Sequence, residues 1–168
     1  MKQHELQQEL PRIAPMLRRF AYSLTGSAAD ADDLLQNTLE RLLSRDVPAD
    51  VELVKWAFRV CRNLWIDEYR ARKVRQKNVY SLDETEEPAV DGEQAIHDQI
   101  TLAQVDAAMD QLSDEQRSIM ALVAVQGMSY KEVAETLGIP AGTVMSRLAR
   151  ARISLINFLN PASGPANI

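Results

Sequence analysis

Three arginines near the C-terminal end carry the clearest chemistry in this sequence. Arg147, Arg150 and Arg152 fall within one expected helix, and no acidic residue follows Glu135. A guanidinium group binds a phosphate as an ion pair and binds a guanine edge through two parallel hydrogen bonds. Small residues at the start of that helix would let its end approach a duplex closely. The pattern therefore predicts a helix that docks in the major groove of DNA.

The segment 129–152 has the order of residues that positions such a helix. Ser129 can cap a first short helix, Gly138 can adopt the left-handed conformation that ends it, and Pro140 can open the second helix. An ordinary helical hairpin with a solvated basic face is the alternative, but the order of cap, glycine turn and proline start favours a helix-turn-helix. The residues expected to anchor the second helix from behind are Val144 and Leu148. The residues expected to contact DNA are Gly142, Thr143, Met145, Ser146, Arg147, Ala149, Arg150 and Arg152.

A second basic zone covers residues 55–77 and holds eight basic residues against two acidic ones. Its cations can neutralise phosphates, and the amide of Asn63 can hydrogen-bond to an exposed base. Aromatic side chains in the zone can stack on such bases, a contact worth about 1–3 kcal/mol per base. For the two tryptophans, packing in the core is the alternative. The aromatic candidates are Trp56, Trp65 and Tyr69.

Charge is unevenly distributed along the chain, whose formal net charge is −5. Residues 83–98 contain seven acids and no lysine or arginine, and basic zones lie on both sides of them. The local field, rather than the net charge, governs binding to a polyanion. The negative net charge therefore does not exclude a nucleic-acid partner.

Hydrophobic periodicity along the 168 residues predicts helices, including a single helix over 51–74, and no strand of any length. The expected fold class is all-α, with two small helical domains joined by a flexible acidic linker and with the helix-turn-helix in the second domain. The expected limits are 1–77 for the N-terminal domain, 78–99 for the linker, 100–160 for the C-terminal domain and 161–168 for a tail. The apolar residues expected to be buried in the second domain are Leu102, Val105, Ala108, Met109, Leu112, Ile119, Met120, Leu122, Val123 and Val125.

Several kinds of site are not expected from the composition. One cysteine and two distant histidines leave no intramolecular disulfide and no metal-ligand cluster. The polar N-terminus is not a signal peptide, and no apolar run approaches the roughly 18 residues of a membrane helix, so a cytoplasmic location is expected. With no phosphate loop and no paired histidine, the sequence predicts no catalytic residue, metal, cofactor or small-molecule substrate.

The string GMSYKEVAETLGIPAGTVMSRLARAR resembles the C-terminal domain of the extracytoplasmic-function (ECF) sigma factors, group IV of the sigma-70 family. Members carry a string close to GxSYxEIAxxLGIPxGTVxSRLxRAR there. The upstream LSDEQRSIMAL resembles the family's LPxxxRxxFxL, with Ser113 in place of the proline. The resemblance covers about residues 10–159 in matching order and spacing. It implies that the helix-turn-helix reads the minus-thirty-five promoter element as duplex DNA.

Two further strings in the N-terminal half resemble the same family. ADDLLQNTLERLL resembles AEDLVQETFLRxW, although Asn37 stands where an acid is usual, and the match implies contacts with core RNA polymerase. The implied polymerase-binding residues are Asp32, Asp33, Leu35 and Gln36. WAFRVCRNLWIDEYRAR resembles WLxxIAxNxxxDxxRxR, which implies contacts with the melted minus-ten element, together with the loop 45–50. The implied minus-ten residues are Trp56, Arg59, Arg62, Asn63, Arg70, Arg72 and Lys73.

The family resemblance implies a bacterial, cytoplasmic initiation factor. Its partners would be core RNA polymerase, at the β′ clamp helices and the β flap, together with promoter DNA and an anti-sigma factor. A stand-alone helix-turn-helix repressor is the main alternative. A decoy that sequesters an anti-sigma factor and an all-helical enzyme are two others; the carboxylates considered for an enzyme are Asp32, Asp33 and Glu40.

Overall fold

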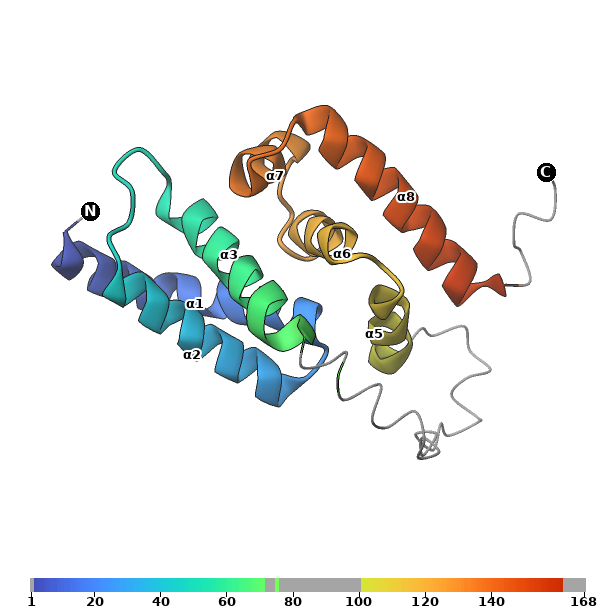
Figure 1. Ribbon diagram of the computed structural model, residues 1–168, viewed down its shortest axis with the longest axis horizontal. Helices are drawn as coiled ribbons and strands as arrows, with labels where there is room; N and C mark the ends of the chain where they lie inside the picture. Colours follow the sequence, from blue (N-terminus) through green and yellow to red (C-terminus); the bar gives the residue numbers. More distant parts are fainter. Residues whose placement is uncertain (1, 72–74, 76–100, 162–168) are drawn as a thin grey trace.

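The computed structural model describes residues 2–71, 75 and 101–161, and every regular element among them is helical (Figure 1). The elements are α1 (Gln3–Thr25), α2 (Ala28–Ser44), α3 (Leu53–Leu64), the π-helical turn η1 (Trp65–Arg70), α5 (Leu102–Asp110), α6 (Asp114–Met120), the π-helical turn η3 (Ala121–Val125), α7 (Tyr130–Leu137) and α8 (Ala141–Leu159). The predicted all-α class is confirmed. The predicted linker, 78–99, and residues 162–168 of the predicted tail lie outside the described residues. No described helix has both the length and the apolar character needed to span a membrane.

The N-terminal region is a bundle of α1, α2 and α3, which lie together on one side of Figure 1. Gly26, at φ +70°, ends α1, and Ser27 caps α2 by accepting a hydrogen bond from the Asp30 amide at 3.3 Å. The rings of Phe20 and Phe58 pack edge to face, 5.1 Å apart, and tie α1 to α3. This packing fixes the face of α3 that is turned away from the core.

The C-terminal region contains the predicted helix-turn-helix, α7 followed by α8. Ser129 accepts a hydrogen bond from the Glu132 amide at 3.1 Å, and Gly138 ends α7 at φ +70°, as the sequence predicts. Pro140 lies at the N-cap, so α8 begins at Ala141, one residue later than predicted. In Figure 1, α8 runs along the outer edge of the molecule.

The π-helical turns decide the placement of Trp65, for which packing in the core was the stated alternative, and correct the predictions for Tyr69 and Val125. A π-turn adds a residue to the helical repeat and so rotates the residues that follow it. Trp65 and Tyr69, in η1, are buried at 2% and 4% exposure and pack in the core, which is the alternative stated for Trp65. In η3 the predicted burial of Val125 is wrong, since its side chain is 46% exposed.

The first turn of α5 also departs from the expected pattern. Ala108, Met109 and Leu112 are buried as predicted, whereas Leu102 and Val105 are 73% and 41% exposed. These two residues line an open groove beside α1 rather than the core.

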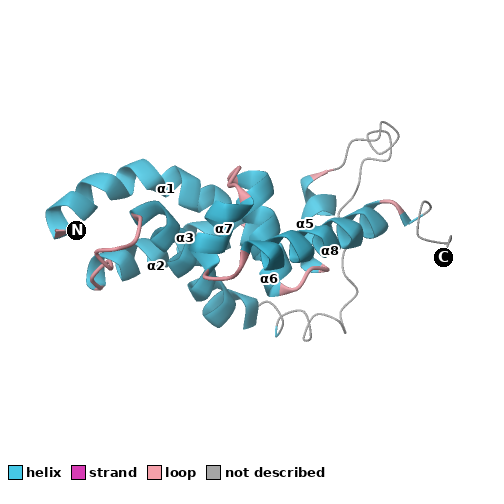
Figure 2. Ribbon diagram, turned by 90° about the horizontal axis from the view of Figure 1, so that it is seen from above, coloured by secondary structure: helices cyan, strands magenta, loops and turns pink. Residues whose placement is uncertain are grey.

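The N-terminal and C-terminal regions pack against each other among the described residues. α1 contacts η3, α3 contacts α7, and buried residues of both regions belong to one continuous cluster. The Arg117 side chain of α6 donates to the Ser23 carbonyl of α1 at 2.9 Å, and Gln126 donates to the Met16 carbonyl at 3.3 Å. Figure 2 shows the helices of both regions in one elongated body.

Candidate nucleic-acid interface

The outer face of α8 holds most of the residues predicted to contact duplex DNA. Val144 and Leu148 are buried at 0% and 1% exposure and anchor the helix, as predicted. A Cβ at Gly142 would meet no atom within 4 Å, so the start of α8 is open to solvent. The exposed residues of this face are Gly142, Met145, Ser146, Ala149, Arg150 and Arg152. Thr143 is half-buried, and its carbonyl accepts a hydrogen bond from the Ser146 hydroxyl at 3.2 Å.

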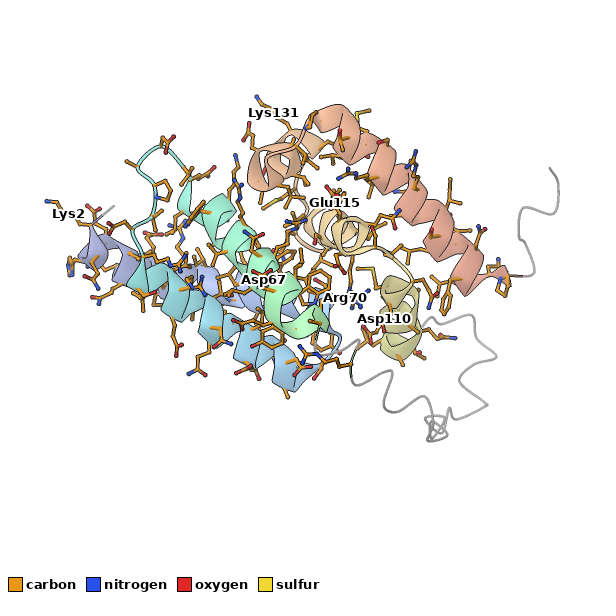
Figure 3. The ribbon with its side chains drawn as sticks, in the orientation of Figure 1. Lys2, Asp67, Arg70, Asp110, Glu115 and Lys131 are labelled. Atoms are coloured by element: carbon orange, nitrogen blue, oxygen red, sulfur yellow. The ribbon has the colours of Figure 1, made fainter. Side chains whose placement is uncertain are left out.

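Arg147 is placed differently from the other arginines of α8. Its guanidinium forms an ion pair with Glu115 of α6, and both side chains are about one-third exposed. Glu115 is labelled on α6 in Figure 3. The pair fastens α8 to the helix behind it, so Arg147 reaches a phosphate only if it leaves or shares that carboxylate.

A pocket of about 390 Å³ lies where α3 meets α7. Trp56 and Arg59, both predicted DNA contacts, line it together with Lys55, Glu135 and the loop that leads into α3. Trp56 is half-buried and Arg59 is exposed, so both can reach a ligand in this pocket.

Lys55 is held by two carboxylates at the edge of this pocket. Its Nζ lies 2.5 Å from Glu135 Oε2 and 3.1 Å from Glu52 Oε2. The hydrogen bond to Glu135, followed by the one to Glu52, raises the pKa of Lys55, while the Lys55 hydrogen bond lowers the pKa of Glu135. Both groups are therefore charged at neutral pH.

The far end of the basic zone also faces the C-terminal region. Arg70, labelled in Figure 3, lies at the seam between η1 and α6. It donates through Nε to Asp114 of α6 at 2.6 Å. Arg62 is half-buried; burial lowers its pKa, Asp114 raises it, and the nearby Arg59 and Arg147 lower it further. Its Nε is buried without a hydrogen-bond partner among the described residues.

Three other residues were predicted to contact the minus-ten element. Asn63 is exposed, and its Oδ1 accepts a hydrogen bond from Arg62 at 3.4 Å. Arg72 and Lys73 lie outside the described residues.

The predicted polymerase-binding residues share helix α2. Asp32 is exposed and pairs with Arg18 at 2.7 Å, and Gln36 is exposed and donates to Glu40 at 3.4 Å. Leu35 is half-buried and packs against the core. The face thus presents acids and an amide around an apolar centre.

Asp33 is connected to the basic zone through Tyr69. The Tyr69 hydroxyl donates to Asp33, and Asn37 donates to that hydroxyl at 2.8 Å. Burial, then the hydrogen bond to Asp33, raises the pKa of Tyr69, so the hydroxyl keeps its proton at neutral pH. A carboxylate at position 37 could not donate a hydrogen bond to this oxygen. This explains why an asparagine stands here, where the family usually has an acid. Tyr69 is therefore a link between α2 and η1, and with Trp65 buried, only Trp56 of the three aromatic candidates lines the pocket.

Lys55 and Glu135 were not among the residues predicted from sequence. Lys55 had a signal, because it precedes Arg59 by four residues and so shares its helix face. Glu135 had none, since its partner is 80 positions away in the chain.

Two family models match the chain, one over each region. Sigma-70 region 2 matches residues 12–75, and Sigma-70, region 4 matches residues 102–155. The second range contains the helix-turn-helix.

The chain is similar over most of its length to proteins of one kind. It is 34% identical over 156 residues to the ECF RNA polymerase sigma factor EcfG of Rhodopseudomonas palustris (strain TIE-1), which is 92% of this chain and 84% of the relative. The sigma factor RpoE of Bartonella quintana, solved with the anti-sigma factor NepR, has a TM-score of 0.68 and 30% identity, covering 92% of this chain and 96% of that one. CnrH, solved with the cytosolic domain of CnrY, has a TM-score of 0.68 and 26% identity, covering 96% and 92%.

The fold and the two basic surfaces define a helical DNA-binding protein with a sigma-70 region 2 followed by a region 4. The chain belongs to the family of ECF RNA polymerase sigma factors. The resemblance identified in the sequence is confirmed, and a stand-alone repressor is not favoured. Sigma factors are initiation subunits of bacterial RNA polymerase and are not themselves enzymes.

Proposed function

We propose that this sigma factor binds core RNA polymerase through α2, captures melted minus-ten DNA on α3, and reads the minus-thirty-five element with α8. The observation that carries the proposal is the two-sided character of α8. Its inner side is closed by Val144 and Leu148, and its outer side presents two arginines beside small residues. A helix of this kind, second in a helix-turn-helix, docks in a major groove.

On α8, base readout is assigned to Ser146 and Arg150, and phosphate binding to Arg152. Arg150 is exposed near the middle of the outer face, where a guanidinium can reach a guanine edge. Arg147 can bind a phosphate only if its guanidinium leaves Glu115 or shares it, because the two side chains form an ion pair.

On α3, the pocket beside Trp56 is assigned to a base of the opened minus-ten element. Trp56 offers an aromatic face, and Arg59 supplies a cation for the adjoining phosphate. Each DNA contact is weak alone, and the chain that joins them raises their combined affinity through effective concentration.

On α2, the exposed Asp32, Asp33 and Gln36 are assigned to the β′ clamp helices, with the β flap contacting region 4. The hydrogen bonds of Asp32 and Asp33 lie within the chain, so the face is ordered before polymerase arrives. The domain limits 1–77, 78–99 and 100–160 belong to the same proposal, as does action in the cytoplasm, where polymerase works.

Control by an anti-sigma factor is also part of the proposal. A similar sigma factor was solved with an anti-sigma factor, and this chain has an apolar groove of about 530 Å³ between α1 and α5. Leu102, Val105 and Val125 are exposed there, as expected of a surface that a partner covers. Leu102→Glu should therefore raise reporter transcription in unstressed cells; unchanged repression would remove the groove from the proposal.

The test of the function is run-off transcription with core polymerase on a genomic library, which also identifies the promoter. Arg150→Ala should then lower transcription by about 5- to 150-fold where the upstream element is intact, the range expected for one good base contact. Arg152→Ala, the matched control, should lower transcription similarly on all promoters. An equal loss for Arg150→Ala on promoters with that element scrambled would refute base reading. The absence of any specific transcript would favour the anti-sigma decoy instead.

A further inference from the structure

Acids of the C-terminal region meet the cations of α3 and η1 along one seam. Glu135 of α7 pairs with Lys55, and Asp114 of α6 pairs with Arg70. The partners in each pair come from different regions and are 80 and 44 positions apart in the chain. These contacts therefore depend on the two regions being closed on each other.

The first pair lies on the pocket assigned to DNA. Lys55 and Glu135 both line the space that also contains Trp56 and Arg59. A carboxylate oxygen at 2.5 Å from Nζ occupies the position that a phosphate oxygen would take on the same cation. Only 23% of the Lys55 side chain is exposed and Glu52 also lies 3.1 Å from Nζ, so the lysine has little room for a phosphate while Glu135 remains.

The second pair covers the other end of the same surface. Arg70 and Asp114 are 38% and 34% exposed, at the junction of η1 with α6. Between the pairs, the guanidinium of Arg59 lies about 3.7 Å from where a Cβ on Gly138 would be. The turn between α7 and α8 thus also lies close to this face.

Arg62 indicates that the closed arrangement is not optimal for the basic surface. Its Nε is buried and has no partner among the described residues, and two other arginines act on it with the same charge. A half-buried cation with an unsatisfied donor destabilises the arrangement that buries it. Asp114 of α6 and Arg147 of α8 act on this group from the C-terminal region, so separation of that region from α3 would return it to water or give it to a phosphate.

We propose that Glu135 and Asp114 form an acidic lid that mimics DNA phosphates, and that Lys55 beneath it is a further DNA-binding residue of the minus-ten surface. The inference rests on the proposed function of α3. In the isolated chain the lid competes with single-stranded DNA for Lys55 and Arg70. Productive binding requires α7 to move away, which polymerase can favour by binding the two regions apart.

The competition predicts how DNA affinity responds to loss of the acids. If only the open fraction of molecules binds DNA, the apparent dissociation constant is the intrinsic one divided by that fraction. Exposed ion pairs shift such an equilibrium by up to about fivefold each. Glu135→Gln should therefore lower the apparent dissociation constant for DNA about two- to fivefold. The double variant, Glu135→Gln with Asp114→Asn, should lower it further.

The experiment is fluorescence anisotropy of a labelled single-stranded oligonucleotide pool of mixed sequence with the full chain at low salt. The matched control is Glu132→Gln, an exposed acid on the same helix, which should leave binding within about twofold of the unchanged chain, since losing one remote charge alters binding only weakly. Lys55→Ala should weaken binding, and it should do so more strongly in the Glu135→Gln background, where the lysine is uncovered. Circular dichroism on each variant verifies that the fold is retained.

The outcomes separate the lid from the function on which it rests. Equal affinities for the Glu135→Gln, Glu132→Gln and unchanged chains would overturn the lid, and so would equal tightening by both glutamine variants, which reports only net charge. Arg59→Ala tests the DNA surface itself in the same assay. If it weakens binding while Glu135→Gln does nothing, the minus-ten assignment stands and the lid alone fails.

Discussion

Arg117 provides the sharpest test of what holds the two regions together. Its side chain is only 4% exposed and makes three polar contacts: Nε donates to the Ser23 carbonyl at 2.9 Å, Nη1 to Asp110 at 2.5 Å, and Nη2 to Asp106 at 2.8 Å. Arg117→Met keeps much of the side-chain volume and removes all three donors. It leaves two carboxylates and a carbonyl oxygen of α1 without this partner.

The expected loss of stability follows from the burial of these groups. Removing one partner of a buried ion pair costs about 3–5 kcal/mol. The side chains of Asp106 and Asp110 are 32% and 20% exposed, so water partly replaces the arginine and the lower end, about 3 kcal/mol, applies. With a urea m-value of about 2 kcal/mol/M, the unfolding midpoint should fall by about 1.5 M.

Urea unfolding followed by two probes measures this change. Both tryptophans, Trp56 and Trp65, report on the N-terminal region, whereas far-ultraviolet circular dichroism reports on all helices. Because the Arg117 side chain also donates a hydrogen bond to α1, its loss should uncouple the two regions. The unfolding transition seen by tryptophan fluorescence should then separate from the one seen by circular dichroism in Arg117→Met. Arg117→Lys, which keeps the charge but loses the fork of donors, should lie between. A midpoint of Arg117→Met within 0.3 M of the unchanged chain, a difference of about 0.6 kcal/mol, would refute the reasoning.

Three further predictions follow from local geometry. Gly26→Ala should lower the melting temperature more than Gly127→Ala does. Both glycines have φ near +70°, but only at Gly26 would the added Cβ strike the Asp106 carboxylate. Equal decreases in melting temperature would contradict this prediction. Burial raises the pKa of the single thiol, Cys61, to about 12. A thiol reagent at pH 8, which is within roughly a unit of the usual thiol pKa, should therefore react with Cys61 only when the chain unfolds. Rapid reaction of the native chain would contradict this prediction. The raised pKa of Tyr69 favours the folded state below its ordinary value of 10.0, and this contribution is lost as pH rises beyond that value. Urea midpoints of the unchanged chain should therefore fall more than those of Tyr69→Phe above pH 10, and parallel curves would count against it.

The parts of the fold that could be predicted from the sequence are those that depend on residues close together in the chain. The cap at Ser129 and the left-handed glycine at 138 lie within a few residues of the helices they limit, so their effect can be read from a short window. The buried anchors of α8 follow from a helical repeat alone.

The parts that could not be predicted depend on contacts between distant residues. The slip from α to π hydrogen bonding at Trp65 and Ala121 keeps the same residues helical and changes only which side chains turn inward. Periodicity with a fixed repeat therefore misplaced Tyr69 and Val125. The seam between α3 and α7 was equally hidden, because neither Lys55 nor Glu135 has a local signal for the other.

The contacts that close the seam differ in strength from one end to the other. Near α1, Arg117 is buried and holds two carboxylates and a carbonyl, an arrangement that is costly to break. Near α3, the pair of Lys55 and Glu135 is partly exposed and weakened by salt. Opening should therefore begin at α7, with the Arg117 contacts acting as the pivot, so that Lys55 is uncovered first while the pair of Asp114 and Arg70, next to Arg117 on α6, separates later. Hydrogen exchange would detect this order as faster exchange in α7 than in α6.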